Sequence, residues 1–203
     1  MLRKTISGLS AGLLITLGGA VFLACDNRYA GAVLFSVALL CICLKGYALF
    51  TGKVGFIPEK HGKEEISVLL LGLLGNALGT VLGGWLIRAG LPKLGEAAEA
   101  LCAAKLTQLP GQTFVRALFC GVLMYLAVSV YRDQKQAIGI LFCIPVFILS
   151  GFEHSIADIF YFAASGMVSL KAFVFLWIVI AGNSVGGMLL PLLQTLGGTR
   201  HAG

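Results

Sequence analysis

The sequence predicts an all-α integral membrane protein that crosses the bilayer six times, and three observations lead to this fold class. Of the 203 residues, 58% are hydrophobic and only 12% are charged, whereas a soluble domain carries roughly 25% charged residues. The apolar residues form six runs separated by short polar segments, and two of these runs stop early at a glycine. With so little polar surface, lipid must face much of the molecule.

The first half contains three runs. Residues 6–25 are long for the apolar part of a signal peptide, and five more runs follow, so we interpret them as a first span, although Ala24-Cys25 faintly resembles a lipoprotein cleavage site. Residues 29–44 would rise only about 24 Å as a helix, less than the roughly 30 Å hydrocarbon core, and they stop at Lys45-Gly46. Residues 66–87 are long enough to span.

The second half repeats this order. A short amphipathic helix is expected at residues 94–106, at the mouth of the protein. Residues 114–130 are slightly short for a span but can recruit flanking residues. Residues 137–150 are again too short, and they stop at Gly151. Residues 172–193 are long enough to span. Runs two and five are therefore the interrupted ones.

Short matching motifs relate the two halves. They align with nearly constant offsets of 109, 105 and 107 residues: residues 11–14 with 120–123, 46–47 with 151–152, and 75–79 with 182–186. Three spans per half is an odd number, so the second half enters the membrane from the opposite side. The sequence therefore predicts one channel domain, residues 1–203, built as an inverted repeat with halves of about 1–110 and 111–203. The binding site of such a protein lies where the interrupted helices meet.

The charges and cysteines exclude several other classes. The net charge is +6, but the basic residues form no dense stripe and lie between apolar runs, which indicates membrane topology rather than nucleic-acid binding. If the N-terminus lies inside, the segments on the inner side of the membrane carry nine lysines and arginines, and those on the outer side carry six. This excess favours both termini in the cytoplasm. The six cysteines form no CxxC motif. We therefore expect no metal, no cofactor and no disulfide framework.

Two ionisable residues follow the second interruption. A charge inside the bilayer costs at least ~2.5 kcal/mol, so Glu153 and His154 are expected to face a cavity or each other. His154 is predicted to line a pore and move a proton, or else to cap a helix. Glu153 is expected to accept N–H bonds at the start of the next half-helix. Asp158, four residues beyond His154, could face the imidazole and favour its protonated form.

The first interruption supplies further candidates. Thr51 could offer its hydroxyl to a substrate or to His154, or bond its own loop. Lys45 complements the negative end of the preceding half-helix and could also attract anions. Asn76 and Asn183 lie in matching GNxxG segments, and we expect their amides to support the two interrupted loops.

These motifs resemble the formate/nitrite transporter family, and the likeness covers all six runs. The most specific match is residues 151–157, GFEHSIA, with the signature of that family's fifth helix. The other matches are residues 49–52, 75–76, 116–120, 126–128 and 182–187.

The resemblance implies an aquaporin-like helical fold and a homopentamer with one pore per protomer, in the cytoplasmic membrane of a bacterium. It implies passage of small monovalent anions or their acids: formate, nitrite, hydrosulfide, acetate or lactate. The family's central histidine corresponds to His154 and its loop threonine to Thr51. Its two apolar constrictions correspond to Phe35, Leu39, Leu49 and Phe147.

The chain also departs from the family pattern. Gly121 replaces an asparagine near the histidine, which should remove a polar partner and widen the site. Ala48 replaces an acidic residue, and Asp158 replaces an asparagine.

The leading functional hypothesis is a channel for a small weak-acid anion, with His154 assisting protonation directly or through a polarised site. The alternative is a proton-coupled symporter of a larger acid such as acetate or lactate. An intramembrane enzyme is disfavoured because no nucleophile or metal-ligand pair accompanies Glu153 and His154. A water or glycerol channel is disfavoured because paired Asn-Pro-Ala motifs are absent.

Overall fold

The computed structural model describes residues 1–198, and this part of the chain is helical without strands. Arg200, one of the nine cations counted above, lies outside the described residues. The helices are α1 Leu2–Ala24, α2 Arg28–Lys45, α3 Phe50–Lys53, α4 Lys63–Gly90, α5 Pro92–Lys105, α6 Pro110–Gln134, α7 Ile138–Leu149, α8 Ser155–Ser165 and α9 Leu170–Leu196, with a 3₁₀ turn at Val54–Phe56.

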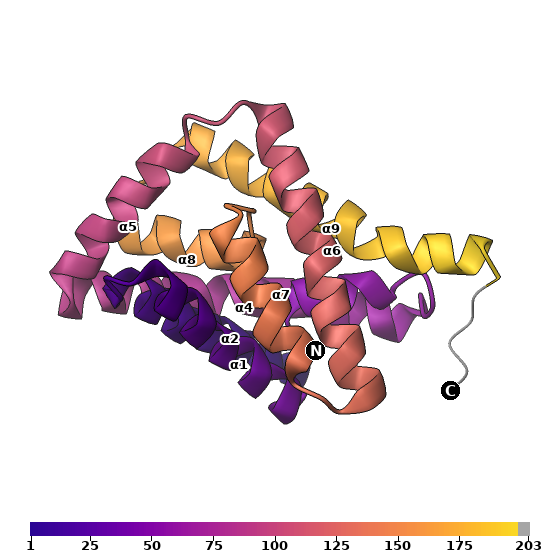
Figure 1. Cartoon of the computed structure of the whole chain (residues 1–203). Helices are drawn as coiled ribbons and strands as arrows, with labels where there is room; N and C mark the ends of the chain where they lie inside the picture. Colours follow the sequence, from indigo (N-terminus) through magenta and orange to yellow (C-terminus); the bar gives the residue numbers. More distant parts are fainter. Residues whose placement is uncertain (199–203) are drawn as a thin grey trace.

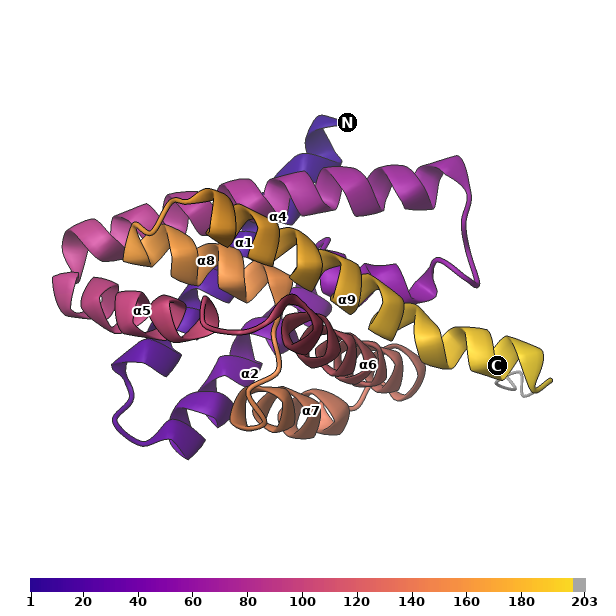
Figure 2. The ribbon, with the colours of Figure 1, turned by 90° about the horizontal axis from the view of Figure 1, so that it is seen from above.

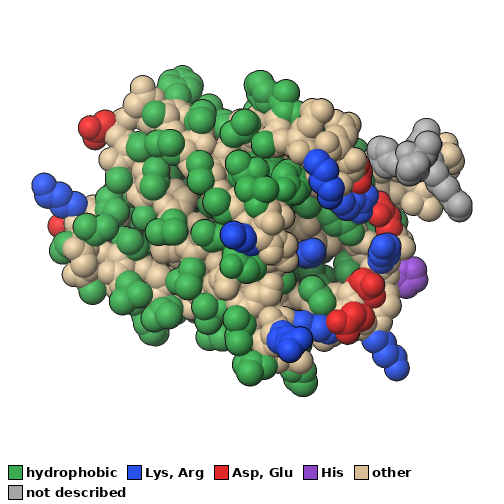
Figure 3. All heavy atoms as spheres, turned by 90° about the horizontal axis from the view of Figure 1, so that it is seen from below, with side chains coloured by type: hydrophobic (Ala, Val, Ile, Leu, Met, Phe, Trp, Pro, Cys, Tyr) green, Lys and Arg blue, Asp and Glu red, His purple; other side chains and the backbone are tan. Residues whose placement is uncertain are grey.

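Five of these helices, α1, α2, α4, α6 and α9, are long enough and apolar enough to cross a membrane, and α7 and α8 are shorter apolar helices. Large apolar side chains such as Trp85, Leu86 and Trp177 are more than half exposed. Figure 3 shows hydrophobic side chains spread over one face of the molecule, with charged side chains gathered mainly towards one end. A surface of this kind is stable against lipid tails and not against water.

The same packing appears in both halves of the chain. α1 packs along α4, and α6 packs along α9. α2 lies against α7, one from each half, and α8 packs against α1, α4, α5 and α9. Figures 1 and 2 show α8 in the interior, with α5 running alongside it. Ten of the eleven residues of α8 are buried, so this short helix forms part of the core.

Gly46 and Gly151 end α2 and α7 in the same way. Both have a left-handed conformation, with φ of 67° and 69°, which costs glycine little because it has no Cβ. At both places the N–H of the following residue donates to the carbonyl five residues back, at 3.0 Å. This pairing satisfies carbonyls at the helix end and turns the chain away. The chain is then extended at Leu49 and His154, immediately before α3 and α8 begin.

Helix boundaries differ from the predicted runs mainly by extension. α4 and α6 begin before residues 66 and 114 and end after residues 87 and 130. The apolar runs count only residues suited to the hydrocarbon core, whereas the helices continue into charged turns at their ends. The expected amphipathic helix at residues 94–106 is α5, Pro92–Lys105.

Candidate functional site

His154 and Thr51 join the two interrupted segments at the centre of the molecule. Thr51 Oγ1 lies 2.9 Å from His154 Nε2, and the two residues are 1% and 3% exposed. The Ala157 N–H, in the first turn of α8, donates to His154 Nδ1 at 3.2 Å. Since a backbone N–H can only donate, Nδ1 carries no proton. The proton of the neutral ring therefore lies on Nε2, which donates to Thr51. His154 both caps α8 and contacts Thr51.

Asn76 and Asn183 bond the two interruptions in matching ways. Asn76 Oδ1 accepts the Phe50 N–H at 2.8 Å, and its Nδ2 donates to the carbonyls of Gly8 and Ala48, both at 2.8 Å. Each amide thus links the end of an interruption, the start of the next short helix and a neighbouring long helix.

Asn183 repeats the pattern. Its Oδ1 accepts the Ser155 N–H at 2.8 Å, and its Nδ2 donates to the carbonyls of Ala117 and Glu153 at 2.8 and 2.9 Å. These partners are offset from those of Asn76 by 105 to 109 residues, the same offsets that relate the sequence motifs. Both amides are fully buried, so their hydrogen bonds hold the extended segments rigidly.

The four apolar residues picked out by resemblance are buried, and they fall into two pairs that line different cavities. Phe35 and Phe147 meet edge to face with ring centroids 6.3 Å apart, and the Phe147 ring stacks on the His154 ring at 5.6 Å. Phe35 and Phe147 line one cavity. Leu39 and Leu49 line another. His154 lines the cavity of Phe35 and Phe147, and Thr51 is two residues from Leu49, which lines the other cavity, so the contact between Thr51 and His154 joins the segments that border the two cavities.

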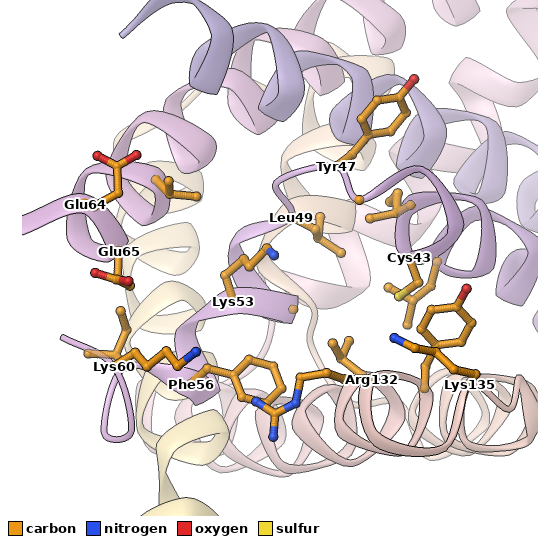
Figure 4. Close-up of a pocket in the computed structure, with 18 residues that line it drawn as sticks. Cys43, Tyr47, Leu49, Lys53, Phe56, Lys60, Glu64, Glu65, Arg132 and Lys135 are labelled. Carbon is orange, nitrogen blue, oxygen red and sulfur yellow. The ribbon is translucent and has the colours of Figure 1, made fainter. Parts of the chain in front are cut away.

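The cavity on the Leu49 side, here the Lys53 cavity, has a volume of about 450 Å³. Its apolar floor is rimmed by the cations Lys53, Lys60, Arg132 and Lys135 and by Glu64 and Glu65. Figure 4 shows Lys53 beside Leu49, with the Arg132 guanidinium against Phe56, 4.1 Å from the ring centroid. Lys45, the cation expected to attract anions, is exposed at the end of α2 and does not line this cavity.

The cavity on the Phe147 side, here the Glu153 cavity, has a volume of about 360 Å³ and contains a buried ion cluster. The Lys105 ammonium, from the end of α5, pairs with Glu153 and lies 2.9 Å from Asp158 Oδ1. Gln108 Nε2 donates to Glu153 Oε1 at 2.6 Å. Burial opposes the charge on Lys105, but the two carboxylates outweigh it and raise the pKa of the ammonium above its usual range.

Two expectations about the acidic residues differ from this geometry. The Glu153 carboxylate accepts from Lys105 and Gln108 rather than from N–H groups of α8, because Asn183 and His154 already occupy those groups. The Asp158 carboxylate pairs with Lys105 and is no partner of the imidazole, whose nitrogens are bonded to Thr51 and Ala157.

Gly121 does not widen the site. It lies where α6 crosses α9, and a Cβ built there would stand 2.8 Å from the backbone nitrogen of Gly187. The residue faces the neighbouring backbone rather than either cavity, so glycine here permits the helix crossing. Ala48 contributes two main-chain hydrogen bonds: its N–H donates to Ser7 Oγ at 2.9 Å and its carbonyl accepts from Asn76.

Lys105 and Gln108 are the residues of this region that sequence reasoning missed. They are 48 and 45 residues from Glu153 along the chain. The available signal was the amphipathic pattern of α5, whose buried face includes Gly95, Ala98 and Cys102. A lysine at the end of that face must find a partner inside the protein, but periodicity alone does not identify which one.

The sequence and the fold were compared with known proteins. The family profile described as "Formate/nitrite transporter" matches residues 1–196. The chain is 29% identical over 188 residues to the uncharacterised transporter YwcJ of Bacillus subtilis, covering 83% of this chain and 73% of that protein. It is 31% identical over 172 residues to the nitrite transporter NirC of Escherichia coli, covering 78% of this chain. The match spans only 63% of that transporter's length.

Solved structures share the fold. A structure titled "Pentameric formate channel with formate bound" superimposes with a TM-score of 0.82 at 23% identity, and the match covers 98% of both chains. A second, titled "FNT family ion channel", gives a TM-score of 0.79 at 23% identity, covering 98% of this chain and 89% of that one. At these identities the likeness establishes the helical arrangement.

Proposed function

Because the chain belongs to the formate/nitrite transporter family, we propose that it is a membrane channel for small monovalent anions of the formate, nitrite and hydrosulfide class, or for their conjugate acids. The observation that carries this proposal is the contact between Thr51 and His154, which joins the segments that border the two cavities. A pore with a single polar point between apolar constrictions suits a small solute that sheds most of its water.

The proposed topology has six crossings. α1, α4, α6 and α9 each cross once, and α2 with α3, and α7 with α8, form two interrupted crossings. Residues 1–110 and 111–203 are then inverted halves of one channel domain, with both termini in the cytoplasm of a bacterium. The exposed apolar surface suits lipid and neighbouring protomers, and the structural relative titled as pentameric supports a homopentamer with one pore in each protomer.

The Lys53 cavity is the inner mouth in this topology. Lys53, Lys60 and Lys135 lie around its rim and raise the local concentration of anions. Beyond them, Leu39 and Leu49 remove water from the solute. An unpaired anion is costly in such surroundings. Its passage therefore depends on hydrogen bonds from the central polar groups and on protonation of the anion.

His154 and Thr51 supply the central hydrogen bond. The Thr51 hydroxyl accepts from His154 Nε2, which leaves its own proton free to be donated to an oxygen of the solute. Donation from the neutral ring polarises that hydroxyl. His154 thus assists through Thr51, while Asn76 and Asn183 keep both segments in place.

Proton-coupled symport of a larger acid, acetate or lactate, is the alternative. The buried carboxylates of Glu153 and Asp158 beside the pore favour it, because such groups can carry protons. Passage of an anion alone generates a current, whereas one-to-one symport with a proton does not.

The test is solute uptake by the full chain in proteoliposomes. Initial rates for formate, nitrite, hydrosulfide, acetate and lactate are measured together with the membrane current. The proposal predicts rapid uptake of the smallest anions and slower uptake of lactate. If none of the five enters faster than into protein-free vesicles, the proposed function is wrong. Faster uptake of acetate and lactate without current would select the alternative.

A further inference from the structure

The ion cluster in the Glu153 cavity carries more negative than positive charge. One ammonium, from Lys105, faces two carboxylates, those of Glu153 and Asp158, and both acidic residues are at most 2% exposed. If both were ionised, one net negative charge would remain buried beside the pore. A buried charge without compensation is so costly that the group usually takes up a proton instead. The cluster therefore holds one proton.

The hydrogen bonds indicate which oxygen holds it. Both oxygens of Glu153 are occupied, Oε1 by Gln108 and Oε2 by Lys105. Asp158 Oδ1 lies 2.9 Å from the Lys105 ammonium, but Oδ2 is buried without a hydrogen-bond partner in the described part of the chain. Glu153 thus has more partners than Asp158 that stabilise an ionised carboxylate. The geometry assigns the proton to Asp158 Oδ2.

The groups around Asp158 offer few competitors for this proton. Cys102 comes from α5, Cys120 from α6 and Tyr161 from the next turn of α8, and each experiences the charge of Asp158. These are weak acids that stay protonated near neutral pH. Lys105 is the cation in direct contact.

Two arginines line the same cavity but bond elsewhere. Arg28 donates to the carbonyl of Ile148 at 3.2 Å, and Arg116 donates to that of Gly151 at 3.3 Å. They cap the carbonyl end of α7, where a cation complements the helix dipole. At the cavity they add positive potential that attracts anions, without pairing with Asp158.

His154 is not suited to be the donor itself. Its Nδ1 has no proton because it accepts from Ala157, and its Nε2 proton is donated to Thr51. Transfer of that last proton would leave an imidazolate, which is far too basic to form near neutral pH. His154 and Asp158 line the same cavity, so an anion in contact with the histidine is also within the space that Asp158 borders.

We propose that Asp158 donates its proton to a weak-acid anion that enters the Glu153 cavity, so that the solute crosses the apolar part of the pore as the neutral acid. The proton leaves Asp158 Oδ2 and bonds to an oxygen or sulfur of the anion. Asp158 becomes a carboxylate that shares Lys105 with Glu153, and a hydrated proton from the bulk solution on the open side of the cavity restores the acid. Each crossing then carries one anion and one proton and no net charge.

This inference rests on the proposed function and narrows its substrate class. Anions of weak acids, such as formate, nitrite and hydrosulfide, can take the proton. Anions of strong acids, such as nitrate, cannot, and they gain no passage from Asp158.

The test uses Asp158→Asn in the full chain, reconstituted in proteoliposomes that contain a pH-sensitive dye. Formate is added outside at a series of external pH values, and internal acidification and current are recorded. The wild-type protein should acidify the vesicles without current, at a rate that falls as external pH rises. Asp158→Asn should lower the rate by ~10²-fold, the lower end of the contribution of a positioned acid, and flatten the pH profile.

Two further variants separate proton donation from structural support. Glu153→Gln removes the same surplus negative charge, so it should reproduce Asp158→Asn, and it replaces that variant if the latter fails to fold. Lys105→Met removes the positive charge, so the carboxyls keep their protons to higher pH and the rate profile should move to higher pH. Loss of structural support alone would lower the rate in all three variants and would not move the pH profile of Lys105→Met to higher pH. Glu99→Gln, on the exposed face of α5, is the matched control and should behave as wild type.

The outcomes distinguish the two proposals. Wild-type rate and pH profile in Asp158→Asn would overturn the role of Asp158 and leave the channel function standing. Absence of weak-acid uptake by the wild-type protein would instead refute the proposed function itself.

Discussion

Replacing Gly121 with alanine should destabilise the protein by forcing α6 and α9 apart. The added Cβ would stand 2.8 Å from the backbone nitrogen of Gly187 and 3.0 Å from the carbonyl carbon of Asn183. Both neighbours are backbone atoms, which cannot rotate away as a side chain can. Overpacking of this kind costs about 1–3 kcal/mol, and alanine recovers about 1 kcal/mol of helix propensity relative to glycine. The expected net loss is up to about 2 kcal/mol relative to wild type.

The assay is thermal unfolding of the full chain in detergent, followed by circular dichroism, with Gly111→Ala as the matched control. Gly111 is also in α6, but a Cβ there would meet nothing within 4 Å, so the control should be as stable as wild type or slightly more stable. Because Gly121 contacts Asn183, displacement of α9 should also loosen the loop that carries His154 and lower solute uptake. A Gly121→Ala protein as stable as Gly111→Ala would refute the close crossing of α6 and α9.

Other substitutions test three separate parts of the site. Asn76→Ala and Asn183→Ala each leave one buried N–H and two carbonyls without their partner, so each should lose stability by about 1–3 kcal/mol or more, and similar losses in both would agree with the inverted repeat. Thr51→Val keeps the shape but removes the hydroxyl, and uptake should fall sharply while Thr51→Ser retains it. Lys53→Gln should lower uptake from the inner side at low salt, with the difference fading at high salt, whereas Lys45→Gln should change little.

Much of the local structure was predictable because it depends on residue type at a given place. A glycine after a short apolar run accounts for the helix ends at Gly46 and Gly151, since few other residues accept the left-handed conformation. The matching offsets anticipated that Asn76 and Asn183 would lie in equivalent surroundings. The candidates Thr51 and His154 came from the same two interruptions, and the structure brings them into contact.

The ion cluster was not predictable in the same way. Sequence spacing placed Asp158 one helical turn from His154, but its partner, Lys105, comes from another helix. Glu153 was expected to bond the helix start by proximity, yet Asn183, 30 residues away, occupies that position. Helical periodicity determines which residues share a face, whereas the choice between nearby and distant partners depends on tertiary packing.

The most direct test of the central claim compares solute uptake by the wild-type protein and by His154→Phe. Phenylalanine can retain the stacking on Phe147 but removes the bonds to Thr51 and Ala157, so the polar contact that joins the two segments disappears. Phe142→Leu, an exposed substitution in α7, is the control for reconstitution. The account predicts rapid uptake of formate or nitrite by the wild type and the control and little uptake by His154→Phe. Equal uptake by all three proteins would contradict a pore in which the solute moves past His154.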